Sequence, residues 1–132
     1  RLPGDGYLRH LKPFRTIEDV HVVGATLAYV IGWARRTKTA ESLVADLSAQ
    51  LLTLAALADA EPLDPRTHLA LHGCYTRFSE VAGGPGFSEL LEAASNDERS
   101  RWMRDRALLQ VAATAREARF EAALRSLGLR TE

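Results

Sequence analysis

Residues 16–36, TIEDVHVVGATLAYVIGWARR, decide the fold that we predict for this chain of 132 residues. When the stretch is drawn as a helix, its apolar side chains cover most of the circumference and are not confined to one stripe. A helix of this kind is normally buried, so we expect a central helix with other helices packed around it. The predicted helix runs from about residue 17 to residue 36. It ends in basic residues, which suit the negative end of the helix dipole.

The start of this helix raises the question of what Glu18 does. Thr16 begins a T-x-x-D variant of the capping box, in which its hydroxyl would accept a hydrogen bond from the amide of Asp19. Glu18 and Asp19 would then lie near the positive end of the helix dipole. Glu18 is therefore either an ordinary helix-start acid or a catalytic carboxylate presented by a buried helix, and local chemistry leaves both readings open.

A column of small residues follows on the same helix, at Gly24, Ala28 and Gly32. Glycine weakens a helix interior by about 1 kcal/mol relative to alanine, so two glycines in one helix need a packing reason. The column indicates either the close approach of another helix or room for a flat cofactor or acyl chain. Gly24 and Ala28 are thus candidates for a substrate pocket, and we expect both to be largely buried.

The sequence before residue 16 has a different character. Pro3, Gly4 and Gly6 surround Asp5 in a turn-rich stretch, and Pro13 favours an extended conformation for the residue before it. We interpret residues 1–15 as an irregular, extended arm or linker from an absent upstream domain, and residues 16–132 as a helical domain. Because the chain begins without an initiator Met, we expect it to be a piece of a longer protein.

Three further helices are predicted downstream of residue 38. Thr39 would cap the second helix, whose apolar face recurs at steps of three and four residues: Val44, Leu47, Leu51, Leu54 and Ala58. Asp64 followed by Pro65 is a start signal for the third helix. The third helix has its own apolar face: Leu71, Cys74, Tyr75, Phe78, Val81 and Ala82.

The glycine-rich segment GGPG at residues 83–86 must end the third helix. A short helical piece is expected around residues 87–94, and Asn96 or Asp97 would then cap a long final helix that reaches about Leu127. Its apolar face includes Leu109, Ala112, Phe120, Leu124 and Leu127, and Gly128 is a suitable C-terminal cap. Short connections favour antiparallel neighbours, so the prediction is an all-α, up-and-down antiparallel four-helix bundle with an irregular N-terminal arm.

Composition limits the classes of function. The net charge is zero, which argues against nucleic acid and against a polybasic membrane surface as partners. The charge is unevenly distributed, with seven Lys/Arg against three Asp/Glu in residues 1–38 and two against eight in residues 39–95. No apolar run approaches the roughly 20 residues that span a bilayer, and a single cysteine excludes an internal disulfide. The predicted location is therefore the cytoplasm.

No metal site is predicted. The Glu-x-x-His spacing at residues 18–21 occurs once, whereas di-iron bundles use two copies and two further glutamates. His68 and His72 share a helical face, but a third ligand is not evident, because Cys74 lies about 200° around the helix from His72. We interpret the histidines as ordinary surface or interface residues and Cys74 as a small buried hydrophobic residue.

Two stretches resemble a known family of flavoproteins. Residues 2–36, LPGDGYLRHLKPFRTIEDVHVVGATLAYVIGWARR, are similar to the junction between the central β-domain and the C-terminal helical domain of acyl-CoA dehydrogenase-like proteins. Residues 101–124, RWMRDRALLQVAATAREARFEAAL, resemble the last helix of divergent, actinobacterial-type members. The glycine-rich flavin-contacting segment and the late glutamate loop of many members are not found in this chain.

The resemblance implies FAD-dependent α,β-dehydrogenation of acyl-CoA thioesters by a bacterial, homo-oligomeric parent protein. In one subset of the family the catalytic glutamate lies six residues before a glycine, and Glu18 lies six residues before Gly24. The N-terminal and β-domains of the parent would be partners of this domain and would complete the FAD site. The chain alone is expected to hold no cofactor and to be inactive.

The alternative function is a helical dimerisation or interaction module, such as the C-terminal part of a regulator with no catalytic role. Such a module would also carry a small-residue column and an uneven charge distribution. The coding sequence upstream of Arg1 distinguishes the two hypotheses, because a β-rich domain would support the flavoprotein and a helix-turn-helix would support the regulator.

Overall fold

The computed structural model describes residues 4–38 and 41–130, and within these ranges it contains helices and no strand. The elements are the π-helical turn η1 (Tyr7–Leu11), α1 (Lys12–Thr37), α2 (Glu41–Ala58), α3 (Pro65–Ala82), α4 (Pro85–Glu92), α5 (Asn96–Asp105), the 3-10 turn η2 (Arg106–Gln110) and α6 (Ala113–Ser126). The all-α class is confirmed. The described residues form six α-helices, which differs from the four that we predicted.

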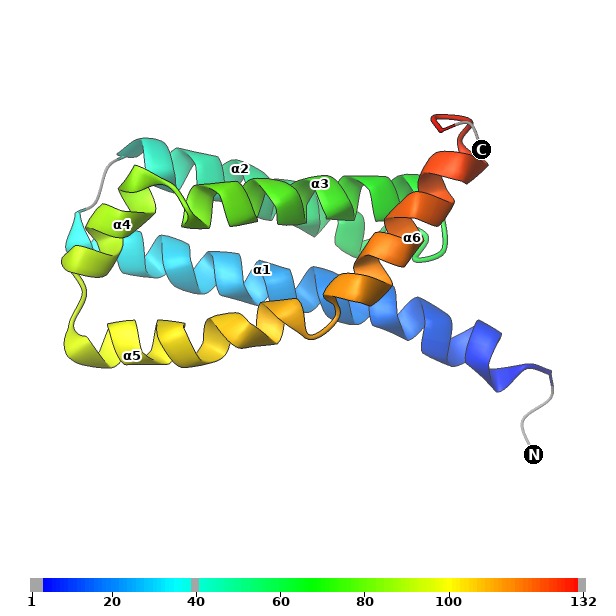
Figure 1. The fold of residues 1–132 in the computed structure, drawn as a ribbon, viewed down its shortest axis with the longest axis horizontal. Helices are drawn as coiled ribbons and strands as arrows, with labels where there is room; N and C mark the ends of the chain where they lie inside the picture. The colour runs from blue at the N-terminus through cyan, green and yellow to red at the C-terminus, as the bar shows by residue number, and fades with distance from the viewer. Residues whose placement is uncertain (1–3, 39–40, 131–132) are drawn as a thin grey trace.

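Figure 1 shows how the helices are arranged. α2 runs antiparallel to α1 and α3 runs antiparallel to α2, and α4 is a short helix at the turn that follows α3. α5 then runs along the side of α1 that faces away from α2 and α3 in this view. α6 crosses the bundle obliquely at the end where α2 passes to α3, and it packs on α3.

The N-terminal segment is helical from Tyr7 onward, so the prediction of an extended arm is wrong for these residues. Pro13 lies in the first turn of α1, directly after the π-helical turn. Proline has no N–H to donate and its ring clashes with the carbonyl four residues earlier, whereas a π turn bonds each carbonyl five residues onward. The amide of Lys12 accordingly donates to the carbonyl of Tyr7, and the helix continues through the proline.

Thr16 does not cap the first helix, because α1 begins four residues earlier at Lys12. The Thr16 side chain is buried inside the molecule, where its hydroxyl accepts from Arg119 on α6 at 3.4 Å. Glu18 is therefore in the second turn of α1 and not at its start. The predicted capping box and the helix-start interpretation of Glu18 are both wrong.

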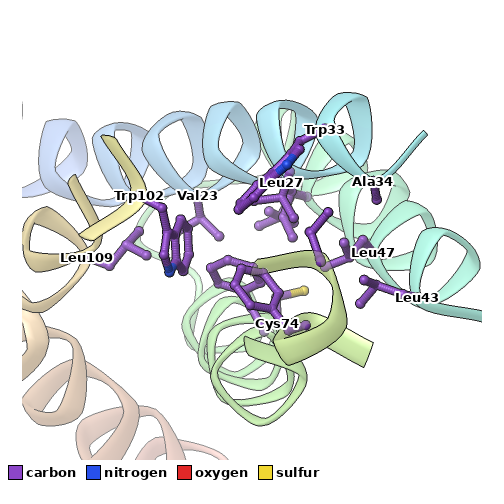
Figure 2. Packing of buried hydrophobic residues seen from close by; sticks show 14 of the residues in the cluster. Val23, Leu27, Trp33, Ala34, Leu43, Leu47, Cys74, Trp102 and Leu109 are labelled. Atoms are coloured by element: carbon purple, nitrogen blue, oxygen red, sulfur yellow. The ribbon is translucent and has the colours of Figure 1, made fainter. Parts of the chain in front are cut away.

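The hydrophobic core lies between α1, α2, α3 and α4, and aromatic side chains join its parts. Figure 2 shows Trp33, Leu27 and Val23 pointing from α1 into the cluster, with Trp102 at its edge. The Trp33 and Phe87 rings meet edge to face at 6.2 Å between centroids, a preferred geometry for aromatic pairs. The prediction that Val23 and Leu27 are buried is confirmed, with exposed fractions of 2% and 0%.

One side of α1 is nevertheless open to solvent. Val22, Ala25, Ala28 and Tyr29 are exposed, and Gly24 is half-buried. The prediction that Ala28 is largely buried is wrong, and α1 is not surrounded on all sides. Apolar residues around a helix predict burial, but they do not distinguish burial within the chain from an apolar surface that the fold leaves open.

α2 contributes Leu43, Leu47 and Leu54 to the core. Its expected cap, Thr39, lies outside the described residues. By length and composition α2 could also cross a membrane, with a mean hydropathy of 1.3 over 18 residues of which 22% are buried. This is weak support for a membrane span, because core helices of soluble proteins meet the same criterion.

The signals around the third helix are confirmed in part. Asp64 caps α3, accepting from the amide of Arg66 at 2.8 Å, and the glycine-rich segment ends α3 at Ala82. The Arg66 side chain donates to the same carboxylate, and this bond is the main cause that lowers the pKa of Asp64 to about 2. Ser95 caps α5 with a full capping box to Glu98, in place of the predicted Asn96 or Asp97.

The long final helix that we predicted is broken into α5, η2 and α6. The break is stabilised by contacts that are distant in sequence. The carbonyl of Leu109 accepts from the Tyr75 hydroxyl on α3 and from the Arg116 guanidinium on α6. Without these two donors the carbonyl would lack a hydrogen-bond partner beside the turn. With them the chain can bend there, and α6 lies across α3.

Candidate functional site

A large open groove lies between α1 and α5, and we call it the α1–α5 groove. Its volume is about 660 Å³, within the range of small-molecule sites. Its apolar walls include Val22, Ala25 and Tyr29 on α1, Trp102 on α5, and Leu108 and Leu109 on η2. These side chains give the groove a surface suited to an apolar ligand.

The α5 wall of the groove is held in place by two buried residues. Trp102 packs on Phe87, with 4.9 Å between ring centroids, and meets Phe78 edge to face at 6.4 Å. Leu109 is buried seven residues later, and Figure 2 shows both Trp102 and Leu109 pointing into the cluster that contains Val23. These two anchors hold the α5–η2 segment, whose residues line the groove together with those of α1.

The rim of the groove is basic. Arg101 pairs with Asp97 and Arg104 pairs with Asp105, each at 2.6 Å. The Arg104 side chain lowers the pKa of Asp105, so this pair is ionised at neutral pH. Arg106 has no ion pair among the described residues and is the one lining arginine whose charge is left uncompensated. The groove thus combines apolar walls with a free guanidinium at its edge.

Glu18 lies on the same face of α1 as the groove wall. Residues 18, 22, 25 and 29 follow the i, i+4, i+7, i+11 spacing that aligns side chains along a helix. With a rise of about 1.5 Å per residue, Glu18 is about 6 Å along the axis from Val22. Its side chain is 42% exposed, and its carboxylate pairs with Arg15 at 3.2 Å.

Gly24 and Ala28 lie on a different flank of α1. At about 100° of rotation per residue they are roughly 80–120° from the Glu18 stripe, and neither lines the groove. A Cβ built on Gly24 would have Leu51 Cδ1 as its nearest neighbour at 4.0 Å, an ordinary contact. The small-residue column is therefore not a close helix contact. The assignment of these two residues to a substrate pocket stays a prediction.

A group of buried charges was not predicted from the sequence, and we call it the buried ion cluster. Asp19 on α1 accepts from Arg116 at 3.3 Å and also from Arg119, both on α6. Arg116 lies over the Tyr75 ring, with 3.8 Å from its guanidinium carbon to the ring centroid. One buried carboxylate therefore faces two guanidinium groups. These ion pairs connect α1 to α6.

The signal for this cluster was present in the predicted apolar stripe of the final helix. Leu109, Ala112 and Phe120 recur at helical spacing, and Arg116 occupies the position between Ala112 and Phe120. An arginine on an apolar face must find a partner when it is buried. The identity of that partner, Asp19, depends on how α6 crosses α1, and spacing alone does not give it.

The histidine and cysteine residues do not assemble a metal centre. No group of three or more His, Cys, Asp or Glu side chains among the described residues is placed to hold a metal ion. His72 stacks on Phe120, with 3.6 Å between ring centroids. Cys74 is buried and burial raises the pKa of its thiol, as predicted for a small core residue.

Comparison with known proteins does not identify the site. None of the known protein-family models, curated protein sequences or solved structures matches this chain. The function must therefore be argued from the residues and their geometry.

Proposed function

We propose that this chain is the C-terminal helical domain of an acyl-CoA dehydrogenase-like, FAD-dependent oxidoreductase, and that the α1–α5 groove holds the acyl chain of its substrate. The observation that carries the proposal is the alignment of Glu18 with Val22, Ala25 and Tyr29, which form the α1 wall of the groove. A carboxylate one helical turn from an apolar groove can approach the α-carbon of a chain bound there.

The role of Glu18 in this proposal is that of a general base. It would remove a proton from the carbon next to the thioester carbonyl, and this requires hydrogen-bond reach and shielding from water. The exposed part of Glu18 would be covered by the substrate and by the neighbouring domains of the parent. Arg106 at the rim would face the phosphate groups of the CoA part of the substrate.

The described residues do not fit a whole FAD. The groove rim offers one unpaired guanidinium, and the glycine-rich segment 83–86 includes the start of α4, a helix whose residues do not line the groove. The proposal therefore assigns FAD to the domains that precede this one in the parent. In the family the flavin accepts the hydride that leaves the β-carbon of the substrate.

The first experiment tests Glu18 in the full-length protein. Glu18→Gln should abolish reduction of the flavin by acyl-CoA, lowering its rate by several orders of magnitude, while flavin content and melting temperature stay nearly unchanged. Glu89→Gln is the matched control, because Glu89 is exposed on α4 and does not line the groove. Normal activity of Glu18→Gln would refute the catalytic assignment.

The second experiment tests the groove in the 132-residue chain. Trp33→Phe leaves Trp102 as the sole tryptophan, so its fluorescence reports ligand binding in the groove. Octanoyl-CoA should change this fluorescence saturably, and free CoA should bind more weakly because it lacks the apolar chain. Ala25→Leu, which fills the groove, should weaken binding, whereas Ala49→Leu at an exposed position of α2 that does not line the groove should not. Equal effects of the two variants would refute the acyl site.

A second candidate function is supported by a separate observation. Tyr7, Leu8, Leu11 and Phe14 are each 50–59% exposed on η1 and the start of α1, which favours a helical interaction module. If this candidate is right, the 132-residue chain should form a stable dimer in light scattering and octanoyl-CoA should not bind in the groove. A β-rich domain encoded upstream would favour the flavoprotein instead.

A further inference from the structure

A second, smaller cleft lies where the start of α1, the start of α3 and the end of α6 meet, and we call it the α6 cleft. Its volume is about 210 Å³. Lys12, His68 and Arg119 line it together with apolar residues that include Leu63, Ala122 and Ala123. It shares no lining residue with the α1–α5 groove, so it is a separate feature of the molecule.

The three basic side chains come from three different helices. The Lys12 ammonium group and the His68 ring have no hydrogen-bond or ion-pair partner among the described residues. Arg119 is engaged by Asp19, but Asp19 also faces Arg116, so one carboxylate is shared by two guanidinium groups. The positive charges of Lys12, Arg116 and Arg119 are therefore only partly compensated by negative groups.

The rest of the lining is mainly apolar, with Ser126 as its one further polar residue, and the space is small. Leu63, Ala122 and Ala123 belong to this apolar surface. At about 30 Å³ per water in the liquid, the cleft has room for a molecule of only a few heavy atoms. Basic groups beside a short apolar surface suit an anion that carries a short hydrocarbon tail.

We propose that the α6 cleft binds a short-chain carboxylate, with its oxygens facing Lys12, His68 and Arg119 and its tail against Leu63 and Ala122. Charge-assisted hydrogen bonds to an anion are stronger than neutral ones and would compensate the excess positive charge of this region. The site is independent of the proposed dehydrogenase activity and of Glu18.

His68 provides the means to detect the anion. Burial lowers the pKa of His68, and the positive charges of Arg119 and Lys12 lower it further, against weaker opposing effects of Asp64 and Asp19. These groups lie on α1, α3 and α6, the three elements that meet at the cleft. A carboxylate bound beside the ring would favour its protonated form, so the pKa of His68 should rise on binding.

The experiment is an NMR titration of the histidine ring protons in the 132-residue chain with sodium butyrate as the probe. The resonance of His68 should move saturably and its pKa should rise, while exposed His21 on α1 serves as the internal reference. Butyramide, which has the same tail and no charge, should leave the pKa of His68 unchanged. Absence of a saturable shift with butyrate would overturn the proposal.

Variants separate the charge from the tail. Lys12→Met should weaken butyrate binding roughly tenfold or more, whereas Lys38→Met at the other end of α1 should leave it unchanged. If Lys12→Met does not fold, Ala122→Leu tests the same cleft by filling it, with Ala118→Leu as its control. Butyrate binding that survives Ala122→Leu, or equally tight binding of sulfate, would overturn the assignment of a tail site.

Discussion

Asp19 and Arg116 are 97 positions apart in the chain and form a buried ion pair, with 3.3 Å between Asp19 Oδ1 and Arg116 Nη1. The side chains are 10% and 8% exposed, so both charges have lost most of their hydration. The pair joins the helix that decides the fold to the last helix of the chain.

Removing the carboxylate of this pair should destabilise the fold strongly. Asp19→Asn leaves Arg116 and Arg119 without their shared anion, and breaking a buried ion pair in this way costs about 3–5 kcal/mol. Glu18→Gln, which removes an exposed carboxylate at the adjacent position, should change the free energy of unfolding by no more than about 0.5 kcal/mol. Urea unfolding followed by circular dichroism measures both. Similar unfolding midpoints for the two variants would contradict the buried ion cluster.

Replacing Gln50 by a residue without polar atoms should stabilise the protein. Gln50 is buried on α2, and neither its amide nitrogen nor its amide oxygen has a hydrogen-bond partner among the described residues. A buried polar group without a partner costs about 1–3 kcal/mol, and methionine has nearly the same shape. Gln50→Met should therefore raise the free energy of unfolding by about 1 kcal/mol or more. Exposed Gln110→Met is the control, and a destabilised Gln50→Met would reveal an unrecognised partner of the amide.

Two glycine substitutions should have opposite effects on stability. Gly73 lies inside α3, and a Cβ there would meet nothing within 4 Å. Gly73→Ala should stabilise the protein by about 0.5–1 kcal/mol through the higher helix propensity of alanine. Gly128 has a φ of +67°, so Gly128→Ala should destabilise it by about 1 kcal/mol. Thermal unfolding of both variants gives the comparison, and stabilisation by Gly128→Ala would contradict the left-handed conformation at that position.

The Cys74 thiol should react slowly with thiol reagents, and it should make the stability of the fold depend on pH in the alkaline range. Burial raises the pKa of Cys74 in the folded state above the value of about 8.5 in the unfolded chain. Below pH 8.5 the thiol is protonated in both states. Above it the unfolded chain loses the proton first, so this contribution to stability falls as pH rises towards the folded pKa.

Two measurements check this expectation. Ellman's reagent should label the native protein at least ten times more slowly at pH 8 than the urea-unfolded chain. The loss of stability between pH 8 and pH 10 should be smaller in Cys74→Val than in the wild type, because the variant lacks the thiol whereas Tyr75 and other groups titrate in both proteins. Equal losses would show that the thiol does not contribute.

Several features of the fold that follow from neighbouring residues were predicted correctly, although the capping box at Thr16 and the cap at Asn96 or Asp97 were not. Asp64 caps α3 through the amide of Arg66, two residues away, and Gly128 follows the last helix with a positive φ. The burial of Leu27 also follows from local periodicity. These signals are local because each involves hydrogen bonds or spacing within one or two helical turns.

The features that depend on distant contacts were not predicted. The break after α5 is stabilised by Tyr75, which is 34 positions from Leu109, and no sequence pattern between residues 96 and 127 marks it. The candidate site divides in the same way. The alignment of Glu18 with Val22 is contained in the sequence. The groove, however, depends on the packing of Trp102 and Leu109, which positions α5 and η2 beside α1.

Leu109 also belongs to two sites at once. Its side chain lines the α1–α5 groove, and its carbonyl accepts from Arg116 in the buried ion cluster, next to the arginine that lines the α6 cleft. The two cavities are therefore connected by a continuous series of polar contacts through Arg116, Asp19 and Arg119. A ligand that displaces Leu109 changes the energy of that chain, and thermodynamic linkage requires the effect to be reciprocal. We therefore expect the affinity of each cavity for its ligand to depend on whether the other is occupied, although binding in the α6 cleft requires neither Glu18 nor the dehydrogenase activity.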